Sequence, residues 1–97
     1  METNTDFCVR RLKTLADDTR FAVLGALMAQ PLTVGALAER LGVEQSLLSH
    51  HLRLLRDEQL VEAVRHGRSV EYRLAEGVRL SPTALDLGCC RMVFPET

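Results

Sequence analysis

Two short segments of helical periodicity, separated by a tight turn at Gly42, constrain the fold of this chain more than any other feature. In the second segment, residues 45–57, Leu48, Leu52 and Leu55 recur every three or four positions and predict a buried stripe on a helix. Glycine readily adopts the left-handed conformation that ends a helix, so Gly42 predicts the end of the first segment. Two helices joined in this way predict a helix-turn-helix.

The face of the second segment opposite the leucines is polar. The major groove of B-DNA admits one α-helix, and short polar side chains near the helix N-terminus can reach base edges there. We therefore predict that this face contacts double-stranded DNA, with an arginine further along reaching a phosphate. The flanking His51, in contrast, is expected to be a structural, hydrogen-bonded histidine. The predicted DNA contacts on this segment are Gln45, Ser46, Ser49, His50 and Arg53.

After the second helix the apolar period changes to two. Apolar residues recur at about every second position in residues 61–65 and again in residues 69–74, which predicts two strands. Gly67 between them favours a tight turn, so the strands predict a hairpin. A hairpin in this place is the wing of a winged helix-turn-helix, and we predict that His66 and Arg68 contact the neighbouring DNA backbone or minor groove. The predicted fold class is mainly α with a β-hairpin wing.

The length of the chain fits a single domain over residues 1–97. Two further helices are predicted before the helix-turn-helix, one near the N-terminus and one over residues 19–29. The last stretch, residues 75–97, has no clear period. Within it, the dipeptide Ser81-Pro82 predicts the start of a helix, because serine caps helices and proline fits their first position.

The net charge of −1 neither favours nor opposes nucleic-acid binding. Lys13 is the sole lysine, and an arginine can bind phosphate or guanine through two donors at once, so a few arginines suffice. No stretch is long and apolar enough to cross a bilayer, so we expect a cytoplasmic protein without membrane contact. In that compartment the three cysteines are expected to be reduced, and their odd count argues against a simple disulfide framework.

We predict that the protein is not an enzyme. Catalysis needs a nucleophile and a base held together, whereas the histidines and cysteines lie far apart in the predicted fold, and no phosphate-binding glycine loop occurs. A winged-helix module that binds protein in place of DNA is an alternative, supported by the near-neutral charge. The two differ in salt dependence, because phosphate contacts weaken steeply as salt rises.

Four short motifs between residues 12 and 74 match a known pattern. They are Leu15-Ala16-Asp17-Asp18-Thr19-Arg20, Leu37-Ala38-Glu39-Arg40-Leu41-Gly42-Val43, Ser49-His50-His51-Leu52 and Tyr72-Arg73-Leu74. With these motifs the chain resembles the ArsR/SmtB family of metal-responsive repressors. The resemblance implies a homodimer whose first and last helices pair, in which the helix over residues 45–57 reads operator DNA and residues 75–97 form a dimerisation and sensing tail. Two residues depart from the pattern: Glu44 stands where Ser or Asp often caps the reading helix, and Gln59 where Gly commonly follows it.

Members of this family commonly release DNA when a metal ion or metalloid binds. One family site needs a Cys-x-Cys run where this chain has Thr-Val-Gly, at residues 33–35. Another needs histidines on the last helix, where this chain has none. Some members bind trivalent arsenic through cysteines near the chain ends, and the corresponding residues here are Cys8, Cys89 and Cys90.

Three thiolates suit arsenite or antimonite, and softer ions such as cadmium, lead or copper(I) also accept sulfur ligands. We therefore predict a thiophilic inducer bound by the three cysteines, and no cofactor required for folding. One alternative is a redox or persulfide sensor, in which Cys8 becomes linked to one of the two tail cysteines. Another is that Cys8 is a small buried hydrophobe without any sensing role.

Overall fold

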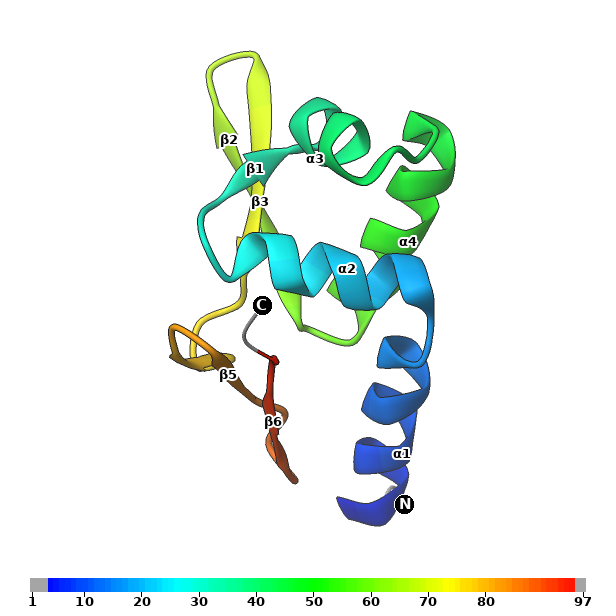
Figure 1. Cartoon of the computed structure of the whole chain (residues 1–97), viewed down its shortest axis with the longest axis vertical. Coiled ribbons are helices and arrows are strands. Elements are labelled where there is room, and N and C mark those ends of the chain that lie inside the picture. The colour runs from blue at the N-terminus through cyan, green and yellow to red at the C-terminus, as the bar shows by residue number, and fades with distance from the viewer. Residues whose placement is uncertain (1–3, 96–97) are drawn as a thin grey trace.

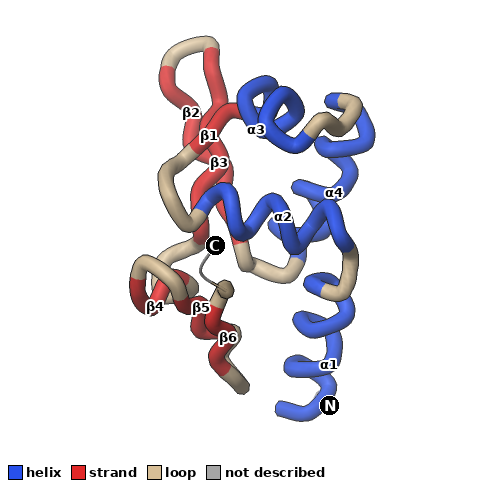
Figure 2. Tube along the Cα trace, in the orientation of Figure 1, coloured by secondary structure: helices blue, strands red, loops and turns tan. Residues whose placement is uncertain are grey.

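The computed structural model describes residues 4–95, which form four helices and two small antiparallel sheets (Figures 1 and 2). The strand order is β1-β3-β2 in one sheet and β4-β5-β6 in the other. None of these helices is long and apolar enough to cross a membrane. The elements are α1 (Asn4–Leu15), α2 (Asp18–Leu27), β1 (Leu32–Thr33), α3 (Val34–Leu41), α4 (Gln45–Asp57), β2 (Val61–His66), β3 (Ser69–Leu74), β4 (Arg79–Ser81), β5 (Ala84–Asp86) and β6 (Arg91–Val93).

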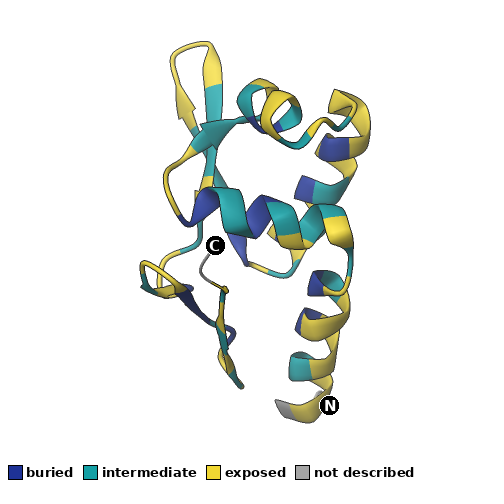
Figure 3. Ribbon diagram, viewed as in Figure 1, coloured by how far each residue is buried: buried dark blue, intermediate teal, exposed yellow. Residues whose placement is uncertain are grey.

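The core lies where α2, α3 and α4 meet the first sheet. Leu48, Leu52 and Leu55 are fully buried, so the predicted stripe on α4 is confirmed (Figure 3). They pack in one cluster with the fully buried Leu24 and Leu37 of the two preceding helices. Burying a leucine side chain stabilises a fold by roughly 1.5–3 kcal/mol, so this cluster holds the helix-turn-helix together.

Local capping fixes the helix boundaries that the sequence predicts. The Asp17 carboxylate accepts a hydrogen bond from the Arg20 N–H at the start of α2. Gly42 ends α3 with a φ of 66°, in the left-handed region. Glu44 caps α4 although the family pattern favours Ser or Asp there, because its carboxylate accepts from the N–H groups of Ser46 and Leu47. Residues 45–57 are therefore one helix, as predicted.

The predicted wing is confirmed as a regular hairpin. β2 and β3 pair in register from Val61 opposite Leu74 to His66 opposite Ser69, and Gly67 occupies the turn with a φ of 60°. β1, a strand of two residues that the sequence pattern did not predict, adds to the other edge of β3. It connects the wing directly to the start of α3.

The structure corrects the prediction for the C-terminal segment. The helix expected from Ser81-Pro82 does not form, and the described part of the segment holds the strands β4, β5 and β6 in its place. Leu85 and Leu87 are both fully buried, two positions apart, which is the alternation of a strand. Residues 75–95 contain no helix, so the last helix that the family resemblance implies is not found in the part of the tail that the structure describes.

Candidate nucleic-acid interface and thiol site

The polar face of α4 is exposed to solvent along its whole length. All five side chains predicted to contact DNA from this helix lie on the exposed face, on the opposite side from the leucines of the core. The Ser46 hydroxyl donates a hydrogen bond to the Glu44 carboxylate, and together with the two N–H donors this lowers the pKa of that carboxyl. The cap therefore holds the helix end that carries Gln45, Ser46, Ser49 and His50, with Arg53 one turn further along.

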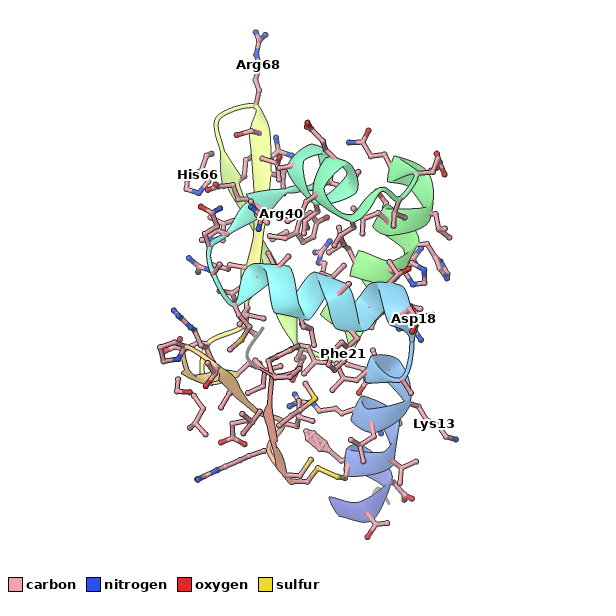
Figure 4. All side chains as sticks on the ribbon, viewed as in Figure 1. Lys13, Asp18, Phe21, Arg40, His66 and Arg68 are labelled. Atoms are coloured by element: carbon pink, nitrogen blue, oxygen red, sulfur yellow. A yellow bond between two sulfur atoms is a disulfide. The ribbon has the colours of Figure 1, made fainter. Side chains whose placement is uncertain are left out.

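The tip of the wing and the N-terminal end of α4 lie at the same end of the molecule, with α3 between them (Figure 1). Arg68 extends from the wing tip away from the rest of the molecule (Figure 4). His66 is also exposed, and its Nε2 lies 3.0 Å from the Glu71 carboxylate across the hairpin. Arg73 is paired with Glu62 at 2.6 Å, so its charge is used in an ion pair on the strand face.

His51 lies between helices and does not face solvent. Its side chain is 12% exposed, and its Nδ1 lies 3.1 Å from the Arg20 guanidinium of α2. The expectation of a structural histidine is confirmed. The contact fixes the orientation of α4 relative to α2.

The three predicted thiol residues come together within one chain. Cys8 of α1 and Cys89 of the turn between β5 and β6 form a disulfide, and the Cys90 sulfur lies 3.9 Å from that of Cys89. All three sulfur atoms lie within 4.8 Å of one another. The expectation that all three cysteines are reduced is therefore wrong for this state of the protein, and the odd count leaves Cys90 as the free thiol.

A tight turn presents Cys89 and Cys90 to α1. The Leu87 N–H donates to the Cys90 carbonyl at 2.8 Å, and the Gly88 N–H donates to the Asp86 side chain at 2.8 Å. Gly88 has a φ of 91°, which strongly favours glycine. A Cβ atom on Gly88 would also lie 3.5 Å from the ring of Phe7, so the turn approaches α1 closely.

Arg11 is a residue of this site that the sequence analysis missed. Its side chain is 8% exposed, donates from Nη1 to the Leu87 carbonyl at 2.8 Å, and lies 4.4 Å from the centre of the Phe7 ring. Burial lowers the pKa of Arg11, and the nearby Glu58 and Asp86 partly offset that effect. The sequence signal was an arginine at helical spacing from Phe7 and Cys8 on the inward face of α1.

The donor set fits a soft ion that takes three sulfur ligands. Sulfur ligands about 2.3 Å from a metal ion lie up to about 4 Å apart in a trigonal arrangement. The sulfur atoms already lie within 4.8 Å of one another, so small shifts bring three thiolates into range once the disulfide is reduced. In the oxidised state only Cys90 offers a free thiol. The site therefore has two exclusive states, a disulfide or a set of three thiols.

The sequence matches the family model of bacterial regulatory proteins of the arsR family over residues 17–63. It is 48% identical over 63 residues to the HTH-type transcriptional regulator NmtR of Mycobacterium tuberculosis, covering 65% of this chain and 52% of that protein. It is 45% identical over 62 residues to the transcriptional repressor SmtB homolog of Synechocystis sp., covering 64% and 47%. The chain thus spans about half the length of these two relatives.

Solved structures match more of the chain. HlyU from Vibrio cholerae superposes with a TM-score of 0.73 at 38% identity, over 78% of this chain and 83% of that one. A homodimeric winged helix-turn-helix DNA-binding domain from Mycobacterium bovis, a possible ArsR-family regulator, superposes with a TM-score of 0.70 at 30% identity, over 76% and 73%. The four helices, the wing and these matches together establish that this winged helix-turn-helix chain belongs to the ArsR family of bacterial regulatory proteins.

Proposed function

We propose that this protein is a transcriptional repressor that binds double-stranded operator DNA as a homodimer in the cytoplasm. The observation that carries the proposal is the exposed polar face of α4, which lies at the same end of the molecule as the wing tip. The names of relatives support it, since NmtR is a transcriptional regulator and the SmtB homolog a transcriptional repressor. The homodimeric state of the related Mycobacterium bovis domain supports the dimer.

In this proposal α4 enters the major groove and the wing contacts the flanking backbone or minor groove. Gln45, Ser46, Ser49 and His50 read base edges. Arg53, His66 and Arg68 contact the backbone or minor groove, and the two α4 helices of the dimer lie about 34 Å apart to match successive major grooves. The exposed Val9 and Leu12 of α1, with Leu80 and Val93 of the tail, supply apolar surface for the second copy. Residues 75–97 thus serve as a dimerisation and sensing tail.

The inducer in this proposal is arsenite, antimonite or another thiophilic ion, bound by Cys8, Cys89 and Cys90. The gathering of the three sulfur atoms within 4.8 Å supports it. A second candidate is regulation by thiol oxidation or persulfide, and the Cys8–Cys89 disulfide supports that one. Ion binding and thiol oxidation would each act on the contact between α1 and the tail. Each would therefore change the spacing of the two α4 helices in the dimer.

One titration with one variant separates the two candidates. Fluorescence anisotropy measures binding of the reduced protein to a labelled duplex from its own upstream region, while arsenite or a mild oxidant is added. We expect arsenite to release the wild-type protein at near-stoichiometric concentration. Cys90→Ser removes one of three ligands, so we expect it to need at least about tenfold more arsenite while it keeps the response to oxidant.

The results of this titration distinguish the metalloid sensor, the redox sensor and a protein-binding module. Release by arsenite that Cys90→Ser weakens supports the metalloid sensor, whether or not the oxidant also releases DNA, and release by oxidant alone supports the redox sensor. DNA binding that neither agent reverses contradicts both sensor proposals and leaves the repressor. Affinity that does not fall as salt rises contradicts phosphate contacts and favours a protein-binding module.

A further inference from the structure

We propose that Leu47 is a specificity-determining residue of the DNA interface, and that it contacts the C5-methyl group of one thymine in each half-site of the operator. This inference rests on the proposed function, in which the N-terminal end of α4 enters the major groove. It adds an apolar contact to the polar contacts proposed for the same helix. The thymine would then be recognised by its methyl group.

Leu47 lies in the first turn of α4, among side chains proposed to read base edges. It directly follows Ser46 and precedes His50 by three positions, a spacing that makes Leu47 and His50 neighbours on the helix surface. Leu47 is 49% exposed. Six large apolar side chains are exposed within residues 4–95, and Leu47 is the one that lies on α3, α4 or the wing. The others lie on α1, α2 and the tail.

The cap of α4 fixes the place from which the Leu47 side chain extends. The Leu47 N–H donates to one oxygen of the Glu44 carboxylate at 3.2 Å, and the Ser46 N–H donates to the other oxygen at 3.2 Å. The Ser46 hydroxyl also donates to this carboxylate. An apolar side chain is therefore held at the end of α4 that lies on the same side of the molecule as the wing tip (Figure 1).

A leucine in the major groove distinguishes base pairs by their methyl groups. The base edges exposed in that groove are hydrogen-bond donors and acceptors, apart from the C5-methyl group of thymine. Against a pair without a methyl group, leucine would cover polar edges and replace none of their hydrogen bonds to water, which is costly. Against a thymine, the leucine and the methyl group bury apolar surface together. Single exposed leucines are common on protein surfaces, and what distinguishes Leu47 is its position beside His50 and Ser46.

The experiment removes single methyl groups from the DNA. Fluorescence anisotropy measures binding of the reduced protein to a labelled duplex from its own upstream region, in which thymidines are replaced one at a time by deoxyuridine. Deoxyuridine differs from thymidine only in lacking the methyl group. We expect replacement at one position of each half-site to weaken wild-type binding about fourfold, the effect of burying one methylene-sized group.

Variants of Leu47 test whether this side chain contacts the methyl group. Leu47→Ala shortens the side chain, so we expect it to bind the thymidine and deoxyuridine duplexes with equal affinity. Leu47→Met keeps an apolar side chain of similar volume and retains most of the difference. Both replacements favour helix, so α4 is preserved. Arg53→Gln is the matched control, because loss of a phosphate contact weakens binding to both duplexes and leaves their ratio unchanged.

Two results would overturn the inference while the repressor proposal stands. One is salt-sensitive binding that no deoxyuridine replacement weakens. The other is a loss on deoxyuridine replacement that persists in Leu47→Ala, which would assign the effect to another side chain or to DNA shape. A wild-type protein that binds no duplex with salt-dependent affinity would contradict the proposed function, and this inference with it, so the two failures are distinguishable.

Discussion

Gln59 follows the C-cap of α4 and has a φ of 60°, a backbone conformation that residues other than glycine rarely adopt. The turn is a Schellman motif, because the Leu60 N–H donates to the Leu55 carbonyl and the Gln59 N–H donates to the Arg56 carbonyl. We predict that Gln59→Gly stabilises the protein by about 0.5–1 kcal/mol, since relief of strain outweighs the added freedom of the unfolded chain. Urea denaturation of the two proteins measures the difference, and a lower midpoint for the variant would contradict it.

Glu44 makes the end of α4 that is proposed to read DNA sensitive to acid. Hydrogen bonds from the Ser46 hydroxyl and from the N–H groups of Ser46 and Leu47 lower the pKa of the Glu44 carboxyl. The ionised form is therefore favoured by folding, and its stabilising effect is present above the ordinary pKa of glutamate and lost as pH falls through the lowered value. Glu44→Gln removes this dependence.

We predict that the urea midpoint of the wild-type protein exceeds that of Glu44→Gln at pH 7, and that the difference shrinks as pH falls below the ordinary pKa of glutamate, about 4.3. The measurement is a series of urea titrations between pH 7 and pH 3. Parallel midpoints over the whole range would show that the carboxylate does not stabilise the helix end.

Among the helices and strands, the sequence best predicts those whose limits are set by nearby residues. The limits of α4 and of β3 follow from the spacing of leucines, the caps and Gly67, all within a few residues of each boundary. The helix α2, predicted over residues 19–29, is found at Asp18–Leu27, an error of the size usual for helix ends. Local signals of this kind do not depend on the rest of the fold.

The tail was mispredicted because its strands are specified by distant contacts. Each of its strands has three residues, too few to show a period. The segment is held by contacts that the sequence cannot reveal, such as the packing of Phe94 against Phe21 of α2, with ring centres 5.0 Å apart. Ser81 and Pro82 favour a helix start locally, and this tertiary packing overrides the preference. Sequence analysis also missed Arg11 for the same reason, since its partner Leu87 lies 76 positions away.

The candidate site, like the fold, could be predicted from the sequence only in part. The family resemblance, together with the preference of soft ions for sulfur, identified the three cysteines as possible ligands. That Cys8 meets Cys89 and Cys90 in the same chain depends on the fold of the tail, so it could not be predicted from spacing. The predicted DNA contacts lie on α4 and on the β2–β3 hairpin, which are both specified by local sequence signals. The contacts on α4 are exposed because the opposite face of that helix is buried.

At the scale of the whole molecule, oxidation is predicted to change stability. The Cys8–Cys89 disulfide joins residues 81 positions apart, and closing a loop of this length stabilises a fold by roughly 4 kcal/mol in the chain-entropy model. We predict that reduced wild-type protein unfolds at lower urea concentration than oxidised protein. Cys90→Ser retains the disulfide and serves as the control, so its response to reductant should equal that of the wild type. Identical midpoints for both redox states would contradict the prediction.

The position of the same disulfide has a topological consequence. Oxidation closes residues 8–89 into a covalent ring, because the bond joins Cys8 to Cys89. The helix-turn-helix and the wing both lie inside that ring. A protease that cuts any single peptide bond between the two cysteines separates the reduced protein into two pieces, but only opens the ring of the oxidised one. A nicked oxidised molecule keeps all its parts covalently joined until its disulfide is reduced.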